Sequence, residues 1–395
     1  MTLPTMAPTE PETEETAPPT TQAPPETAPT EPSAEPSTEP ATEDDAEAEL
    51  QRQLAGLTTE EKVAQLFFVT PEALTQISGA ATVAGETTRA AFEEFPVGGI
   101  LYMGQNLVSP DQAKALLSGM QAISLDRIGL PVFLGVDEEG GSVARISGNS
   151  AFAVGPYPNM SSLDGDTRRA AEIGTELGQY LADLGFNLDF APVADVLVNP
   201  ENTVVRERAF STDAGEVCAM CAAFSDALQA GGVLACYKHF PGHGATTADS
   251  HTGSAVSDRT PEQLRTCELL PFQDATARKI PFLMVGHISL PRVTGDDVPA
   301  SLSPALVQGL LRQELGYDGV VITDALNMGA IRQRYSPEEA VVQAFLAGND
   351  MLLVSDELPA CYQAVLDAVA DGTISTERLD ASVLRILRAK LLLAS

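Results

Sequence analysis

The chain has 395 residues, of which 55 are acidic and 23 basic, so its formal net charge is −32; it contains no tryptophan. This charge argues against binding to nucleic acid or to an anionic membrane surface, because both require a basic face. The sequence contains no run of about 18 apolar residues, so it predicts no membrane-spanning helix.

Residues 1–49 contain 11 Pro and 13 Asp or Glu, with neither Lys nor Arg. A segment of this composition has too little apolar surface to offset the entropy that it would lose on folding. Its Pro residues and like charges keep it extended. We expect a disordered acidic Pro/Thr-rich linker over 1–49 and a single globular domain over 50–395. Such a linker suggests an extracytoplasmic protein, either a cell-surface lipoprotein or a secreted one. The linker has no charged segment followed by an apolar one, so we expect any export signal to have been removed.

Eight short apolar runs follow along the chain, and each predicts a strand that is buried on both faces of a parallel sheet. They are residues 65–70, 97–103, 131–137, 186–193, 233–240, 281–287, 319–325 and 350–355. Amphipathic segments between and after them predict helices, over 110–125, 167–185, 261–279, 303–316, 358–372 and 376–394.

Eight strands that alternate with helices are typical of a closed (β/α)8 barrel, the TIM barrel, in the α/β class. The alternative is an open doubly wound sheet, which normally carries a Gly-rich phosphate loop after its first strand. The segment QLFFVTPEALTQ contains no such loop. The sequence therefore favours the barrel.

Polar residues stand where four of the predicted strands end. They are Asp137, Lys238 with His239, His287 and Asp324. Active sites of (β/α)8 barrels lie at the carboxyl ends of the strands. We therefore expect these side chains to share one pocket.

Three of the four histidines, His239, His243 and His251, lie in the segment KHFPGHGATTADSH. Zinc would require two histidines at helical spacing and a third ligand, whereas the Pro and Gly residues of this segment interrupt a helix. We therefore expect no metal. Asp249 and His251 are two residues apart, so their side chains would point the same way in an extended segment. A carboxylate beside an imidazole raises its pKa, which gives a group that donates and takes back a proton near neutral pH.

Asp324 follows the run VVIT, where a carboxylate could attack an anomeric carbon or stabilise positive charge on it. The alternative is that Asp324 caps the helix that follows. Asp137, Arg145, Lys238 and Arg208 could bind sugar hydroxyls, although each could instead form an ordinary salt bridge. Uncompensated charges at the bottom of a pocket are costly, so several converging ones favour a polar ligand. The lack of tryptophan favours a small pocket for one terminal sugar.

Six motifs occur in this order: GVDEEGGSVAR, VVRERAF, KHFPGHG, ADSH, MVGH and ITDALNM. Together they resemble the glycoside hydrolases of family 3, specifically their β-N-acetylglucosaminidase branch, over about residues 55–355. The resemblance implies a (β/α)8 barrel that hydrolyses terminal, non-reducing β-linked N-acetylglucosamine with retention of configuration. It also implies that Asp324 is the nucleophile of a covalent glycosyl-enzyme intermediate, that His251 is the acid/base and that Asp249 is its partner.

The resemblance further implies a sugar subsite, lined by Asp137, Arg145, Arg208, Lys238, His239 and His287. Arg206 competes with Arg208 for this role, but the Ala-Phe that follows Arg208 fixes the register. The reaction implies no metal or organic cofactor. We expect a monomer whose partner is a small carbohydrate, from peptidoglycan fragments or chitooligosaccharides. A phosphorylase, a β-glucosidase and a non-catalytic sugar-binding protein remain as alternatives.

Overall fold

The computed structural model describes residues 43–246, 250 and 253–393. Most of the predicted linker therefore lies outside the described residues. Residues 43–395 form one compact unit.

All eight predicted strands are present, and they form one parallel sheet in chain order. They are β1 (Phe67–Val69), β2 (Gly99–Leu101), β3 (Phe133–Val136), β6 (Leu188–Asp189), β7 (Leu234–Phe240), β9 (Phe282–Val285), β11 (Val320–Thr323) and β12 (Leu352–Val354). The last strand, β12, pairs with β1, and a bridge from Ile322 to Met351 joins β11 to the start of β12. The sheet is thus a nearly closed (β/α)8 barrel, as predicted.

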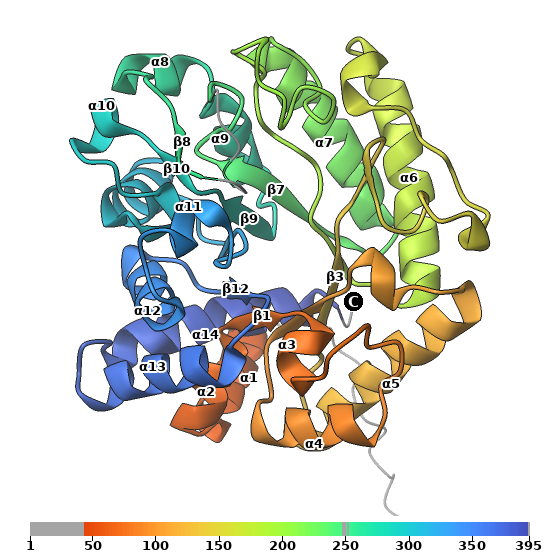
Figure 1. The fold of residues 1–395 in the computed structure, drawn as a ribbon, viewed down its shortest axis with the longest axis vertical. Coiled ribbons are helices and arrows are strands. Elements are labelled where there is room, and N and C mark those ends of the chain that lie inside the picture. The colour runs from red at the N-terminus through yellow and green to blue at the C-terminus, as the bar shows by residue number, and fades with distance from the viewer. Residues whose placement is uncertain (1–42, 247–249, 251–252, 394–395) are drawn as a thin grey trace, which may run out of the picture. The chain divides into compact units, whose positions relative to one another are not determined.

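Four further strands form two small ribbons outside the barrel: β4 (Glu138–Gly140) with β5 (Val143–Ala144), and β8 (Ala255–Val256) with β10 (Ile288–Ser289). Helices surround the barrel strands, and Figure 1 shows them arranged around the centre. The larger ones are α1 (Glu43–Gly56), α2 (Thr59–Gln65), α4 (Glu86–Glu94), α5 (Pro110–Ile128), α6 (Thr167–Leu184), α7 (Ala214–Ala230), α8 (Pro261–Thr266), α9 (Leu270–Ala277), α12 (Pro337–Ala347), α13 (Leu358–Ala370) and α14 (Thr376–Leu391).

Shorter helices are α3 (Pro71–Thr75), α10 (Pro291–Thr294), α11 (Gly329–Arg332) and four 3₁₀ turns, Gly104–Asn106, Ser150–Phe152, Met160–Leu163 and Ala300–Leu302. In the described part of the chain, no helix combines the length and the apolar character needed to cross a membrane.

Two helical segments differ from the prediction. The single helix expected over 261–279 is divided into α8 and α9, because Pro271 has no N–H for a continuous helix and is tolerated in the first turn of a new one. The segment expected as a helix over 303–316 is a π-helix over Ala305–Glu314.

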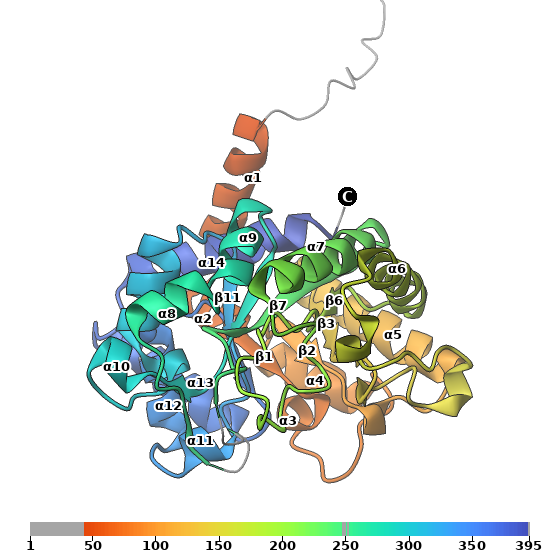
Figure 2. The same cartoon turned by 90° about the horizontal axis from the view of Figure 1, so that it is seen from above.

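The helix α1 begins at Glu43, so residues 43–49 are helical where the sequence predicted linker. Leu50 and Leu54, four residues apart, are buried in the hydrophobic core. Glu47, one turn earlier, accepts hydrogen bonds from Arg388 of α14 at 3.0 and 3.3 Å. Figure 2 shows α1 beside α14. Helix α1 thus includes seven residues, 43–49, that the sequence assigned to the linker, and Glu47 of this segment pairs with Arg388.

Large aromatic side chains fill the interior of the barrel, as the packing of Phe68 from β1 illustrates. Its ring meets that of Phe190 edge-on, with 5.2 Å between the ring centroids. A Cβ atom on Gly99 of β2 would lie 2.3 Å from the Phe68 ring, and one on Gly135 of β3 would lie 2.8 Å from it. Glycine at these two positions is therefore what makes room for the ring.

Candidate active site

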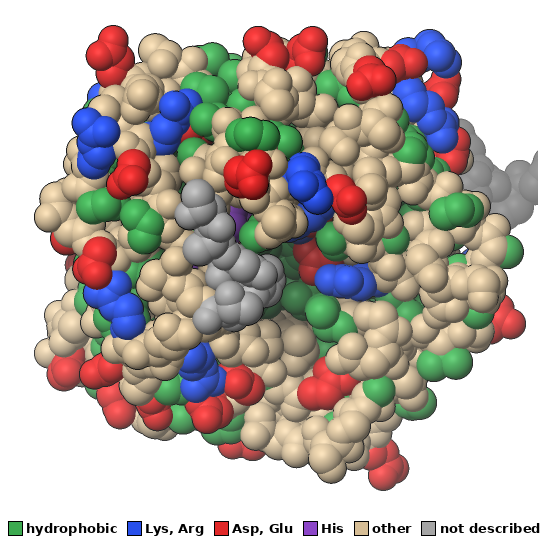
Figure 3. Space-filling view, turned by 45° about the horizontal axis from the view of Figure 1, so that its top comes forward, with side chains coloured by type: hydrophobic (Ala, Val, Ile, Leu, Met, Phe, Trp, Pro, Cys, Tyr) green, Lys and Arg blue, Asp and Glu red, His purple; other side chains and the backbone are tan. Residues whose placement is uncertain are grey.

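The carboxyl ends of the barrel strands surround a cavity of about 520 Å³. Asp137 directly follows β3, Lys238 and His239 lie in the second half of β7, and Asp324 directly follows β11. Figure 3 shows a hollowed face with acidic and basic side chains around the opening. The lining comprises Thr70, Glu72, Leu101, Met103, Gln105, Asp137, Glu139, Val143, Arg145, Phe190, Arg208, Lys238, His239, Met284, Asp324, Ala325, Asn327, Met328, Leu353 and Ser355.

The structure thus brings together six of the residues that the sequence singled out: Asp137, Arg145, Arg208, Lys238, His239 and Asp324. It also separates the two arginines that competed for one role, because Arg208 lines the cavity whereas Arg206 is exposed.

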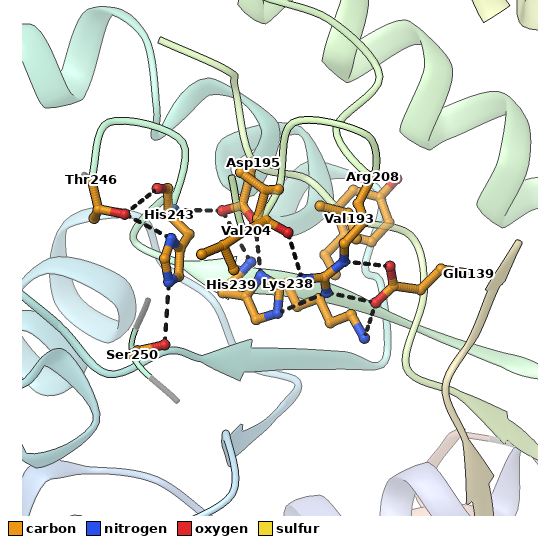
Figure 4. Close-up of polar contacts among 12 residues, drawn as sticks. Glu139, Val193, Asp195, Val204, Arg208, Lys238, His239, His243, Thr246 and Ser250 are labelled. Atoms are coloured by element: carbon orange, nitrogen blue, oxygen red, sulfur yellow. Dashed lines mark hydrogen bonds and ion pairs between the residues drawn. The ribbon is translucent and has the colours of Figure 1, made fainter. Parts of the chain in front are cut away.

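A buried ion-pair cluster forms one wall of the cavity, and its centre is Glu139 (Figure 4). The guanidinium of Arg208 donates to Glu139 through Nε at 2.8 Å and through an NH2 nitrogen at 2.7 Å. Lys238 Nζ lies 2.6 Å from the same carboxylate, and both Lys238 and Glu139 are only 2% exposed. Burial alone would raise the pKa of Glu139, but the two cations outweigh it and hold that pKa well below its usual range. Glu139 is therefore ionised, and it fixes both cations in place.

Asp137 completes this cluster toward the cavity. Lys238 Nζ donates to Asp137 Oδ1 at 2.7 Å, and Arg145 lies 3.9 Å from Asp137 Oδ2. Burial opposes the charge on Lys238, but Asp137 and Glu139 outweigh that effect and raise its pKa. Within the described residues, the buried Nε of Arg145 has no hydrogen-bond partner. A buried N–H without a partner is costly, so a polar ligand in the cavity would relieve that cost.

His239 is oriented by Asp195, a carboxylate that is fully buried behind it. His239 Nδ1 lies 2.7 Å from Asp195 Oδ2, and the backbone N–H of His239 donates to Asp195 Oδ1 at 3.3 Å. Because the carboxylate can only accept, Nδ1 donates to it, and the tautomer that this contact selects leaves Nε2 as the acceptor. Arg208, whose guanidinium can only donate, lies 3.4 Å from that Nε2. This geometry presents an imidazole of defined tautomer to the cavity.

Asp324 stands at the carboxyl end of β11, where its backbone N–H donates to Val285 O at 2.9 Å. Its Oδ1 accepts a hydrogen bond from the backbone N–H of Ala325 at 2.7 Å, which fixes the side chain beside the cavity. The alternative role as a helix cap does not hold, because the next helix begins only at Gly329, after Met328 as its cap residue.

His287 occupies a different place from the one expected for a sugar-binding group. It is buried outside the cavity lining that the described residues form. Its Nδ1 lies 2.7 Å from Ser301 Oγ, and its Nε2 lies 2.9 Å from Ala325 O. The carbonyl can only accept, so Nε2 donates to it. His287 therefore holds the main chain next to Asp324, and this use of both ring nitrogens explains the difference.

Asp249 and His251, the predicted acid–base pair, lie outside the described residues. Ser250 between them is described and is buried. The sequence reasoning missed the two carboxylates that orient cavity residues, Glu139 and Asp195. A weak signal was present for both, since each lies within six residues after a predicted or observed strand end, as Asp137 does.

Comparisons with known proteins identify the family to which the chain is similar. The family model described as "Glycosyl hydrolase family 3 N terminal domain" matches residues 58–389. The chain is 33% identical over 324 residues to beta-hexosaminidase A of Pseudoalteromonas piscicida, and the match covers 75% of this chain and 53% of that protein. It is 33% identical over 311 residues to beta-hexosaminidase LpqI of Mycobacterium tuberculosis, over 76% of this chain and 78% of that protein.

Among solved structures, a glycoside hydrolase family 3 beta-N-acetylglucosaminidase from Paenibacillus sp. str. FPU-7 superimposes with a TM-score of 0.80 and 37% identity. The match covers 86% of this chain and 63% of that one. The chain therefore spans about half the length of the Pseudoalteromonas relative and somewhat less than two thirds of the Paenibacillus protein.

Proposed function

Because the chain belongs to glycosyl hydrolase family 3, we propose that it is a retaining, exo-acting β-N-acetylglucosaminidase. The names of its relatives support this activity: two are beta-hexosaminidases, and the solved neighbour is a beta-N-acetylglucosaminidase. The observation that carries the proposal is the cavity, because Asp324 lines it together with Asp137, Arg145, Lys238 and His239.

The polar wall suits a single terminal sugar. Asp137 accepts hydrogen bonds from hydroxyl groups, whereas Arg145 and Lys238 donate to hydroxyl oxygens. Ligand pockets typically have volumes of about 300–1,000 Å³. The cavity of about 520 Å³ lies in the lower half of that range, which suits one sugar ring better than a long oligosaccharide. The cations are already paired with carboxylates, so binding a neutral sugar leaves no unpaired charge.

The proposed reaction has two steps. In the first, a carboxylate oxygen of Asp324 forms a bond to the anomeric carbon while the glycosidic C–O bond breaks, and His251 gives its proton to the departing oxygen. In the second, His251 takes a proton from water, the water oxygen bonds to the anomeric carbon, and the ester bond to Asp324 breaks. In this proposal the carboxylate of Asp249, two residues before His251 in the sequence, favours the imidazolium form that the first step needs.

Two features of Asp324 support its role as the nucleophile. It follows a barrel strand, so the sheet holds its backbone rigidly, and the N–H of Ala325 fixes Oδ1. A nucleophile that is held in place before the substrate arrives needs little reorganisation at the transition state.

The test is a panel of 4-nitrophenyl glycosides, with and without phosphate. We expect turnover of the β-N-acetylglucosaminide to exceed that of the β-glucoside, and Asp324→Ala to abolish it. Asp318→Ala is the matched control, because Asp318 is an exposed residue before the same strand, β11. Near-normal turnover of Asp324→Ala would remove the nucleophile assignment. A preference for the glucoside would indicate a β-glucosidase, and sugar 1-phosphate formed in phosphate would indicate a phosphorylase.

We further propose that the natural substrates are peptidoglycan fragments or chitooligosaccharides, and that a monomer acts on them outside the cytoplasm. The acidic Pro/Thr-rich composition of residues 1–49 supports the location. Comparing kcat/KM on a muropeptide disaccharide and on chitobiose separates the two substrate classes, and light scattering of the purified chain measures the oligomeric state.

A further inference from the structure

A chain of hydrogen bonds runs from His239, which lines the cavity, to Ser250, and Figure 4 shows its members. It begins at His239, whose Nδ1 contacts Asp195 Oδ2 at 2.7 Å. The other carboxylate oxygen, Asp195 Oδ1, accepts from the backbone N–H of His243 at 2.6 Å. One buried carboxylate therefore joins the end of β7 to the turn that follows it.

The ring of His243 continues the chain. Its Nδ1 lies 2.9 Å from Thr246 Oγ1, and its Nε2 lies 3.2 Å from Ser250 Oγ. Burial lowers the pKa of His243 and outweighs the opposite effect of Asp195, so the ring is neutral near pH 7. A neutral ring has one N–H and one acceptor nitrogen, and hydroxyl groups at both ends can satisfy either tautomer.

The turn that carries His243 is rigidly held from a second side. Asn202 Nδ2 donates to His243 O at 2.9 Å and to Thr246 O at 3.1 Å, and Asn199 Nδ2 donates to Thr246 O at 3.0 Å. His243 is therefore a fixed support for whatever its Nε2 contacts.

Ser250 has a second anchor on another element. Its carbonyl oxygen accepts a hydrogen bond from the backbone N–H of Ala330 at 3.1 Å. Ala330 lies in α11, the first helix after Asp324. The side chain of Ser250 thus contacts the turn after β7, and its main chain is hydrogen-bonded to the segment that follows Asp324.

We propose that Ser250, held by His243, is a positioning residue that sets the place of proton transfer relative to the sugar. In the sequence it stands between Asp249 and His251, the two residues of the proposed acid–base pair. Its own hydroxyl is engaged with His243, so it acts through its neighbours and does not contact the substrate. This inference rests on the proposed function and goes beyond it by naming the described residue that links both members of the pair, as their neighbour in the sequence, to His243.

The test uses Ser250→Ala and a matched control, Ser257→Ala. Ser257 is 1% exposed and Ser250 is 2% exposed, but within the described residues the Ser257 hydroxyl has no hydrogen-bond partner. Both variants lose one buried hydroxyl oxygen, and only Ser250→Ala loses the contact with His243. Circular dichroism and the melting temperature of each variant check that it is folded.

The readout is kcat/KM on aryl N-acetylglucosaminides whose leaving groups differ in pKa. General acid catalysis contributes roughly 10²–10⁴-fold, and it matters most for a poor leaving group. We expect Ser250→Ala to lower kcat/KM for the unsubstituted phenyl glycoside about 10- to 100-fold, because a small misplacement of a catalytic group costs up to about 10² in rate. For the 2,4-dinitrophenyl glycoside, whose phenolate leaves without a proton, kcat/KM should change by no more than about threefold. The inhibition constant of N-acetylglucosamine should stay unchanged.

Equal losses on both substrates, or a loss no larger than that of Ser257→Ala, would overturn the positioning role. A second variant, His243→Asn, removes the Nε2 contact from the other side. If the two residues act through this contact, the double variant should lose no more than the worse single variant, whereas fully additive losses would contradict the proposal. A wild-type chain without activity on any N-acetylglucosaminide would instead refute the proposed function.

Discussion

The buried charge cluster at Glu139 gives a sharp prediction for Glu139→Gln. Glutamine keeps the shape of the side chain but removes its charge, which leaves Arg208 and Lys238 buried with Asp137 as the remaining carboxylate of the cluster. Removing one partner of a buried ion pair costs about 3–5 kcal/mol, because the other charge stays desolvated. At about 2.1 cal/mol/K of unfolding entropy per residue, this corresponds to a drop of about 4–7 °C in Tm for a unit of this size.

The control for this prediction is Glu93→Gln. Glu93 is 69% exposed and pairs with Arg127 at 3.2 Å, so its loss should cost less than about 1 kcal/mol. Urea unfolding followed by circular dichroism and scanning calorimetry measure both variants. We also expect Glu139→Gln to lower kcat/KM, because Lys238 and Arg208 lose the group that orients them. If Glu139→Gln is as stable as Glu93→Gln, the cluster does not hold its cations as described.

Two further predictions concern stability. Gly99→Ala places a Cβ 2.3 Å from the Phe68 ring, so it should destabilise the barrel by about 1–3 kcal/mol in urea unfolding, and a wild-type midpoint would contradict this packing. Burial lowers the pKa of Lys390 from its ordinary 10.5 to about 7. Between these two values the unfolded chain binds more protons than the folded one, so this lysine makes stability rise by about 1.4 kcal/mol per pH unit. Lys390→Met should remove that slope in urea titrations between about pH 7 and pH 10, and parallel curves for the two proteins would refute it.

The strands were predictable because each is a short apolar run buried on both faces, which is a local pattern. The run 233–240 matches β7 nearly residue for residue, whereas 186–193 yields only Leu188–Asp189 as β6. Pro192 explains part of that shortening, because it has no N–H to donate to the sheet. The division between α8 and α9 also had a visible signal in Pro271, which the amphipathic pattern of 261–279 obscured.

The cavity residues at strand ends were predictable for the same reason, since the barrel brings all strand ends to one face. The partners of these residues were not. Glu139 pairs with Arg208, 69 positions later, and Asp137 pairs with Lys238, 101 positions later. Nothing local distinguishes Glu139 from Glu138, whose carboxylate instead accepts backbone hydrogen bonds from residues 145–147.

For His287, too, the sequence could not show which contacts the side chain would make. Its place just after β9 predicted that it would share the pocket, and the family resemblance implied contact with the sugar, but a strand end does not determine which way a side chain turns. The hydrogen-bond partners of its two ring nitrogens, Ser301 and Ala325, lie 14 and 38 positions later in the chain. The outcome is a residue that supports the backbone beside Asp324 from outside the cavity lining.

The most direct test of the central claim is to trap the covalent intermediate. A 5-fluorinated N-acetylglucosaminyl fluoride slows the release of the sugar more than its attachment, and mass spectrometry of a protease digest then locates the label. The account predicts about one label per chain, on the peptide and at the side chain of Asp324. A label on another residue, or continued turnover of the reagent with no covalent adduct, would contradict it.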